Sequence, residues 1–98
     1  MDRKEKLKKI AYKCVDILKN KYKVEKVFLI GSLVKGTVHE KSDIDLVVKG
    51  LSSDIYIEAL TELWDFLPGG VELNLIPYED AFDTLKEKTI KEGELIYG

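Results

Sequence analysis

Residues 27–48 read VFLIGSLVKGTVHEKSDIDLVV, and this stretch decides the fold because it holds two apolar segments separated by glycine-containing polar sequence. The first segment, residues 27–30, is short, apolar and ended by Gly31, which predicts a buried β-strand. The second segment, residues 44–48, predicts another strand, ended by Gly50. Two strands with an irregular connection therefore form the expected centre of the molecule.

The flanking sequence predicts helices and further strands around this centre. Apolar residues recur at helical spacing over residues 3–22, and a serine precedes a second helical stripe. The other expected elements are a turn or short helix over 32–37, a loop over 38–42, a helix capped by Ser52 or Ser53, a strand over 71–76, a helix from Pro77 to Gly93 and a short strand over 95–97. This order predicts a small α/β fold, with a mixed sheet and helices packed mainly on one face.

Several side chains on the helical stripes are expected to be core residues. Trp64 and Phe82 lie on these stripes and are better explained as core than as a ligand-binding box. Ile90, on the last predicted helix, is also expected to face inward. The single cysteine, Cys14, also lies among apolar helical positions. It is expected to be buried and unreactive.

Length and composition indicate one globular domain over residues 1–98. Hydrophobic residues make up 45% and charged residues 35%, and no apolar run approaches the roughly 20 residues that a membrane span needs. The first residues are charged throughout and lack the apolar segment of a signal peptide. A cytoplasmic location is therefore expected.

The charges are distributed unevenly along the chain. Residues 1–23 carry nine basic and three acidic residues, a balance of +6, whereas the remainder carries seven basic and fifteen acidic residues, a balance of −8. A basic helix can contact nucleic acid or an acidic partner. A solvated outer face is the favoured interpretation, because no aromatic residues alternate with the lysines to stack on bases.

Two carboxylates, Asp43 and Asp45, flank Ile44 at the start of the second predicted strand. Because side chains alternate along a strand, both acids are expected on one face while Ile44 and Leu46 point into the core. Two like charges on a half-buried strand repel, and magnesium ions, which prefer carboxylate oxygens, are a natural compensation. Taken alone, this pattern is more often a polar strand edge that ends a turn.

A glycine–serine pair, Gly31-Ser32, lies at the end of the first predicted strand, with Gly36 following it. A glycine there lets the backbone approach a phosphate closely, and N–H groups at a helix start form a cradle for anions. Ser32 adds a hydroxyl donor. An anion cradle and a metal-binding carboxylate pair on consecutive strands can bind a triphosphate together with its metals.

The full string runs from Gly31-Ser32 through a second glycine, Gly36, to Ser42-Asp43-Ile44-Asp45-Leu46. It resembles the signature of the DNA polymerase β-like nucleotidyltransferase superfamily, in which a Gly-Ser pair and a second glycine precede Asp-x-Asp. More closely, nearly the whole chain is similar to the minimal nucleotidyltransferase (MNT) family of archaea and bacteria, including its ending, IKEGELIY over residues 90–97. The resemblance implies a single palm-like nucleotidyltransferase domain.

The resemblance also implies a third carboxylate on a neighbouring strand. Glu72 stands in a Val-Glu-Leu sequence where family members usually carry Val-Asp-Leu, and it is one methylene longer than aspartate. The alternative is an ordinary solvent-facing glutamate. Where many members carry arginines between the glycines, this chain has Leu33, Val34 and Lys35, and Lys35 can meet a phosphate only as a point charge. His39 is expected to be a bystander.

The implied reaction is the transfer of AMP from ATP to a hydroxyl acceptor, with two Mg²⁺ ions as cofactors and pyrophosphate as the leaving group. The candidate catalytic and metal-binding residues are Asp43, Asp45 and Glu72. The candidate nucleotide-binding residues are Gly31, Ser32, Lys35 and Ser42.

The family resemblance further implies a partner. It predicts an antitoxin of a type VII toxin–antitoxin pair, which transfers AMP to a tyrosine of a helical HEPN-domain toxin and forms a hetero-oligomer with it. Neither a membrane nor a nucleic acid is an expected partner. Two other functions remain open, namely a non-catalytic antitoxin or binding module of the same fold, and a transferase that acts on a small hydroxylated molecule.

Overall fold

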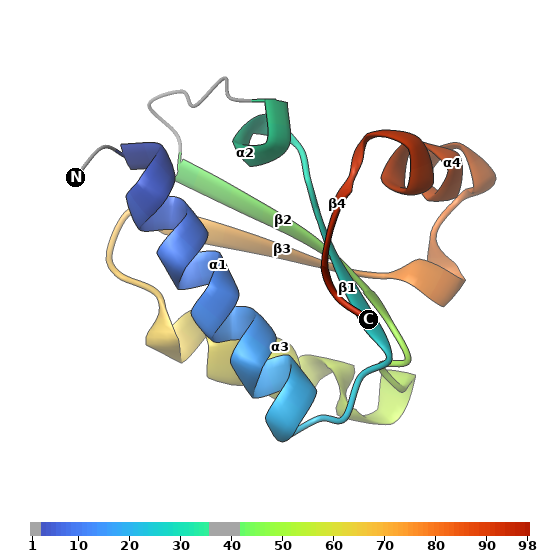
Figure 1. Cartoon of the computed structure of the whole chain (residues 1–98). Helices are drawn as coiled ribbons and strands as arrows, with labels where there is room; N and C mark the ends of the chain where they lie inside the picture. Colours follow the sequence, from blue (N-terminus) through green and yellow to red (C-terminus); the bar gives the residue numbers. More distant parts are fainter. Residues whose placement is uncertain (1–2, 36–41) are drawn as a thin grey trace.

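The computed structural model describes residues 3–35 and 42–98, and for Arg3, Ser32, Lys35 and Ser42 it describes the backbone alone. The helices and strands follow the predicted order (Figure 1). They are α1 (Arg3–Asn20), β1 (Lys26–Ile30), α2 (Ser32–Lys35), β2 (Ser42–Lys49), α3 (Ser53–Phe66), β3 (Val71–Pro77), the 3₁₀ helix η1 (Tyr78–Asp80), α4 (Asp83–Glu92) and β4 (Glu94–Tyr97). No helix in the described ranges is both long and apolar enough to cross a membrane.

The four strands form one mixed sheet in the order β3-β2-β1-β4. Strand β1 is antiparallel to both of its neighbours, whereas β2 and β3 run parallel because α3 connects them. Because the two strands are parallel, β2 and β3 both begin at the same end of the sheet. The predicted small α/β fold with a mixed sheet is confirmed.

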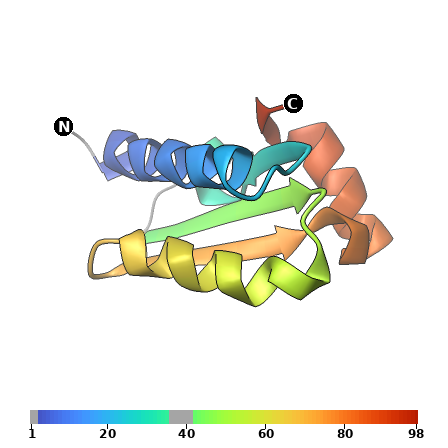
Figure 2. The same ribbon diagram turned by 90° about the horizontal axis from the view of Figure 1, so that it is seen from below.

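One face of the sheet is covered by α1 and α3, which lie side by side in Figure 2. Leu7, Ala11, Cys14 and Leu18 recur on the inner side of α1 at helical spacing and are buried. Burial raises the pKa of the Cys14 thiol to about 11, so this cysteine stays protonated at neutral pH, as expected of a core residue.

The opposite face carries a smaller apolar cluster beneath α4. Phe28, Ile30 and Val47 are buried there, and Leu85 of α4 packs against them. The two longest helices, α1 and α3, thus lie on one face, which confirms the prediction that helices pack mainly on one side of the sheet, while α4 covers part of the other face. Polar strand residues beyond the reach of α4 remain accessible on this second face.

The expectation that Trp64 is a core residue is wrong. Its side chain is 55% exposed, although Ala59 and Leu63 on the same helix are buried. Trp64 lies beside β3, which is an edge strand of the sheet, and its indole Nε1 donates a hydrogen bond to the Leu73 carbonyl at 3.2 Å. An aromatic ring over a sheet edge has protein on one side only, so half of it faces solvent.

The expectation that Phe82 and Ile90 face inward is also wrong, since they are 84% and 61% exposed. The chain forms η1 directly after β3, so α4 begins only at Asp83 and Phe82 becomes its N-cap residue. The inner face of α4 is instead formed by Leu85 and by Thr89, which is buried.

Two side chains of α3 bind the backbone of the edge strand β3. Besides the bond from Trp64, the Tyr56 hydroxyl donates to the Leu75 carbonyl at 2.5 Å. These carbonyls belong to the core residues whose side chains point beneath the helices. The two hydrogen bonds therefore fix α3 along the outer edge of β3 as well as on its face.

The segment directly after α1 is also linked to α3 through Glu62. Its Oε1 accepts hydrogen bonds from Lys21 Nζ at 2.5 Å and from the Tyr22 hydroxyl at 2.7 Å. The bond from Lys21, followed by that from Tyr22, lowers the pKa of Glu62. Burial, followed by the bond to Glu62, raises the pKa of Tyr22 to about 12.

We predict that Glu62→Gln makes the protein less stable at neutral pH and makes its stability less sensitive to acid. A carboxylate with a lowered folded pKa contributes its full stabilisation above its ordinary value of 4.5, and this is lost as the pH falls below that value. Thermal melts followed by circular dichroism should show a smaller difference in melting temperature between wild type and variant at about pH 3.5 than at neutral pH.

The matched control is Glu87→Gln, which removes an exposed carboxylate of α4. It should leave the melting temperature near that of the wild type at both pH values. Equal pH dependence of the wild type and Glu62→Gln would contradict the assigned role of Glu62.

Candidate functional site

Strand β2 places Asp43 and Asp45 on the same face of the sheet, as predicted. Ile44 and Leu46 are fully buried in the core beneath α1 and α3, so the two aspartates between and before them project to the opposite face. Both aspartates are only partly exposed. The like charges are therefore held side by side by the packing of their apolar neighbours.

Strand β3 brings a third acid to this face. In the parallel register, Glu72 pairs with Asp43 and Asn74 pairs with Asp45. The alternation that buries Leu73 and Leu75 points Glu72 and Asn74 away from the helical face, and both are exposed. The predicted position of Glu72 beside the aspartate pair thus agrees with the strand pairing.

Gly31 stands directly against Asp45. It has a φ of +82°, in the left-handed region that favours glycine, and it connects the end of β1 to α2. A Cβ atom built on Gly31 would collide with Oδ2 of Asp45. The backbone conformation therefore favours glycine here, and a side chain at this position would also displace the Asp45 carboxylate.

Asn74 is a site residue that the sequence interpretation did not include. Its Nδ2 donates a hydrogen bond of 2.7 Å to Oδ1 of Asp45. The bond occupies one oxygen of Asp45 and orients the carboxylate, in the manner of residues that support metal ligands. Its spacing of two residues from Glu72 places it on the same strand face, which is the sequence signal that could have identified it.

The oxygens of the two aspartates suit a divalent cation. Oδ1 of Asp43 is buried and has no hydrogen-bond donor in the described part of the structure. A buried acceptor without a donor is costly, and a hard cation that binds carboxylate oxygen would remove this cost. Asp43 and Asp45 are therefore the side chains that fit a metal best.

Glu72 does not complete a three-ligand group with them. Within residues 3–35 and 42–98, no three His, Cys, Asp or Glu side chains converge closely enough to hold a metal ion. Strand pairing puts Glu72 next to Asp43, but its longer side chain is exposed at the sheet surface. Its role as a metal ligand stays a prediction.

Several predicted nucleotide-binding groups lie outside what the structure describes. These are the side chains of Ser32, Lys35 and Ser42. The second glycine of the motif, Gly36, and the expected bystander, His39, also lie outside the described residues. Of the backbone around them, α2 begins at Ser32 immediately after Gly31, as expected of a short helix there, and β2 begins at Ser42.

Comparison with known proteins identifies similar sequences. The family model described as "Polymerase beta, Nucleotidyltransferase" matches residues 12–98. A protein of Methanocaldococcus jannaschii named "Putative protein adenylyltransferase" is 34% identical over 96 residues, which cover 93% of each chain. A second protein of that name from the same organism is 34% identical over 93 residues and also covers 93% of each chain.

Two solved structures resemble the fold closely. A mutant of the toxin–antitoxin pair MntA–HepT superposes with a TM-score of 0.72 at 26% identity, covering 90% of this chain and 72% of that chain. A toxin–antitoxin structure with AMP-PNP superposes with a TM-score of 0.67 at 25% identity, covering 99% of this chain and 74% of the other.

We predict that Gly31→Ala destabilises the protein and displaces Asp45. The left-handed backbone alone costs a residue with a side chain about 1–3 kcal/mol, and the clash with the carboxylate adds to this. Gly70→Ala is the matched control, because Gly70 has a φ of +85° but a Cβ there would have no neighbour within 4 Å. Urea unfolding should show a larger loss for Gly31→Ala, and equal losses would remove the argument for the contact.

We predict that Asn74→Ala weakens divalent-cation binding without unfolding the chain. Loss of a hydrogen bond that supports a metal ligand typically costs about 10- to 100-fold in metal affinity. Isothermal titration with Mn²⁺ would measure this loss, and Asn20→Ala, which alters an exposed asparagine at the end of α1, is the control. Unchanged affinity in Asn74→Ala would show that Asp45 needs no such support.

Proposed function

Because this chain belongs to the polymerase β nucleotidyltransferase family, we propose that it transfers AMP from ATP to a hydroxyl group of a partner protein. Protein adenylyltransferase is the activity in the names of its relatives from Methanocaldococcus jannaschii. The observation that carries the proposal is the aspartate pair on one face of β2, with the left-handed turn at Gly31 against it. Family membership and site geometry thus point to the same chemistry.

The chain's own groups have distinct tasks in this proposal. Asp43 and Asp45 would hold the divalent cations, since both carboxylates share one face and Oδ1 of Asp43 has no other described partner. Asn74 orients Asp45 through its hydrogen bond, and Glu72, which pairs with Asp43 from the adjoining strand, would join the ligand set only after its exposed side chain turns toward the aspartates. Two Mg²⁺ ions, when bound, would activate the attacking hydroxyl and neutralise the leaving pyrophosphate.

The turn after β1 is assigned to the triphosphate. Gly31 ends β1 in a left-handed turn, and the first backbone N–H groups of α2, which follow it directly, are proposed to donate to phosphate oxygens. Ser32, Lys35 and Ser42 are proposed to add hydroxyl and ammonium donors. Positioning of the α-phosphate in line with the acceptor hydroxyl then supplies much of the rate enhancement.

We further infer that the acceptor is a tyrosine of a helical HEPN-domain toxin and that this chain is its antitoxin. The support comes from the structural relatives, which are a MntA–HepT toxin–antitoxin pair and a toxin–antitoxin with AMP-PNP. In this role, AMP on the tyrosine inactivates the toxin. The partner also supplies the surface that positions the acceptor.

We predict that Asp43→Asn and Asp45→Asn each abolish AMP transfer while the fold is retained. Removal of one of two neighbouring like charges relieves repulsion, so the melting temperature should stay equal or rise. Mass spectrometry of the HEPN partner, co-expressed with each variant, would measure the added adenylate. Asp54→Asn, which alters an exposed carboxylate in the first turn of α3, is the control and should leave transfer intact.

Three outcomes separate the alternatives. Full transfer by Asp43→Asn and Asp45→Asn would show that the site is assigned to the wrong residues. A tight complex with an unmodified and inhibited partner would favour the non-catalytic binding module. The absence of any complex, with AMP found on a small hydroxylated molecule, would favour the small-molecule transferase.

A further inference from the structure

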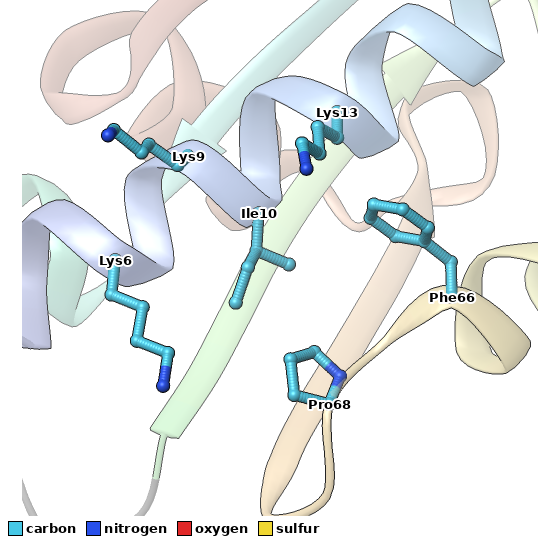
Figure 3. A pocket seen from close by; sticks show the side chains of 6 residues that line it. All are labelled: Lys6, Lys9, Ile10, Lys13, Phe66 and Pro68. Carbon is cyan, nitrogen blue, oxygen red and sulfur yellow. The ribbon is translucent and has the colours of Figure 1, made fainter.

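A groove separates the first half of α1 from the end of α3 and the segment that follows it (Figure 3). Its volume is about 340 Å³. The residues that line it are Lys6, Lys9, Ile10, Lys13, Phe66 and Pro68. It lies on the helical face of the sheet, opposite the face that carries the aspartates.

The floor of this groove is apolar. Figure 3 shows Ile10 pointing from α1 toward β2, with Phe66 and Pro68 on the other side of the gap. Phe66 is 40% exposed, and Pro68 is also exposed. An apolar side chain from another molecule could enter here and bury additional apolar surface.

The rim of the groove is positively charged. Lys6, Lys9 and Lys13 follow one side of α1, and among the described residues none of the three forms an ion pair. Figure 3 shows Lys6 and Lys13 on the side that faces the gap, and Lys13 Nζ lies 5.7 Å from the centre of the Phe66 ring. By contrast, Lys8 and Lys21 are paired with Glu94 and Glu62.

The groove continues toward the end of the sheet at which β2 and β3 begin, close to the acidic residues. A second cavity of about 220 Å³ shares Lys6, Ile10 and Pro68 with it and ends at Val71, the first residue of β3. Val71 pairs with Ser42, and the next residues along the two strands are Glu72 and Asp43. A chain bound in the groove would therefore leave it near the starts of β2 and β3, where Asp43 and Glu72 lie on the opposite face of the sheet.

We propose that this groove docks an acidic amphipathic helix of the partner protein. Its apolar side chain would enter between Ile10, Phe66 and Pro68, and its carboxylates would pair with the lysines of the rim. Seven residues of α1 separate Lys6 from Lys13, which corresponds to about 10 Å, or two turns of a docked helix. The proposal rests on the proposed function for the identity of the partner alone.

The observations favour a protein over a nucleic acid as the occupant. Phe66 is the one aromatic residue among the six that line the groove, and the Lys13 ammonium lies within cation–π distance of its ring. The residues that line the second cavity add no further lysine to the three of the rim, and this cavity leads toward the end of the sheet that carries Glu72 and Asp43. A helix with carboxylates on one side has to pair its charges only with the lysines of α1. It can end before it reaches Glu72 and Asp43.

The test compares the affinity of groove variants for the HEPN partner. Phe66→Ala, and separately the double variant Lys6→Glu with Lys13→Glu, should each raise the Kd at least about tenfold. AMP transfer should fail at low partner concentration and recover when the partner is in excess, while ATP affinity stays unchanged. The matched control is Lys88→Glu with Lys91→Glu, which makes the same charge change on exposed positions of α4.

The outcomes distinguish this inference from the proposed function. Wild-type affinity and transfer in both groove variants would overturn the groove and leave the function standing. A groove-dependent complex without AMP transfer would support the groove and overturn the enzymatic activity. No complex with the wild-type chain would overturn both, and groove variants that lose affinity for single-stranded RNA but not for the partner would assign the groove to nucleic acid.

Discussion

The rest of the molecule depends on one constraint, which is that side chains along β2 alternate between the core beneath the helices and the opposite face of the sheet. Ile44, Leu46 and Val48 are fully buried beneath α1 and α3, so the intervening residues have to face the other way. A shift of one residue in the pairing of β2 would place Asp43 and Asp45 in the core, at a large desolvation cost. The burial of three aliphatic side chains thus keeps two repelling carboxylates together, and Val47, buried beside α4, closes the same face beyond them.

The local sequence was sufficient to predict those features of the fold that follow from the periodicity of a single helix or strand. The buried side of β2, the order of the elements and the Ser52 cap of α3, whose side chain accepts a hydrogen bond from Asp54, are of this kind. The orientations of Trp64 and Phe82 are not, because they depend on which strand ends the sheet and on where the chain leaves η1. An apolar stripe on a helix predicts a buried face only when the sheet extends beneath the whole stripe.

The candidate site also has some features that the local sequence predicts and others that depend on packing between segments. The shared face of the aspartates and the position of Glu72 follow from strand alternation and from the family pattern of residues, whereas the bond from Asn74 to Asp45 requires the register of β2 against β3. That register is set by the packing of α3 and by the turn before β3, and no local pattern contains it. The groove between α1 and Phe66 is likewise created only when distant segments pack together. Interactions between segments are therefore the part of this site that needs coordinates.

The hydrogen bonds from Tyr56 and Trp64 to the carbonyls of β3 have a consequence for self-association. An edge strand with free carbonyls is a template for a strand of another chain, and repeated addition of that kind leads to aggregation. Here the carbonyls of Leu73 and Leu75 are already occupied by side chains of α3. The half-exposed indole of Trp64 also covers part of that edge. Strand addition along β3 would have to displace both side chains, so an aromatic residue that contributes little to the core protects this edge of the sheet from pairing with another chain.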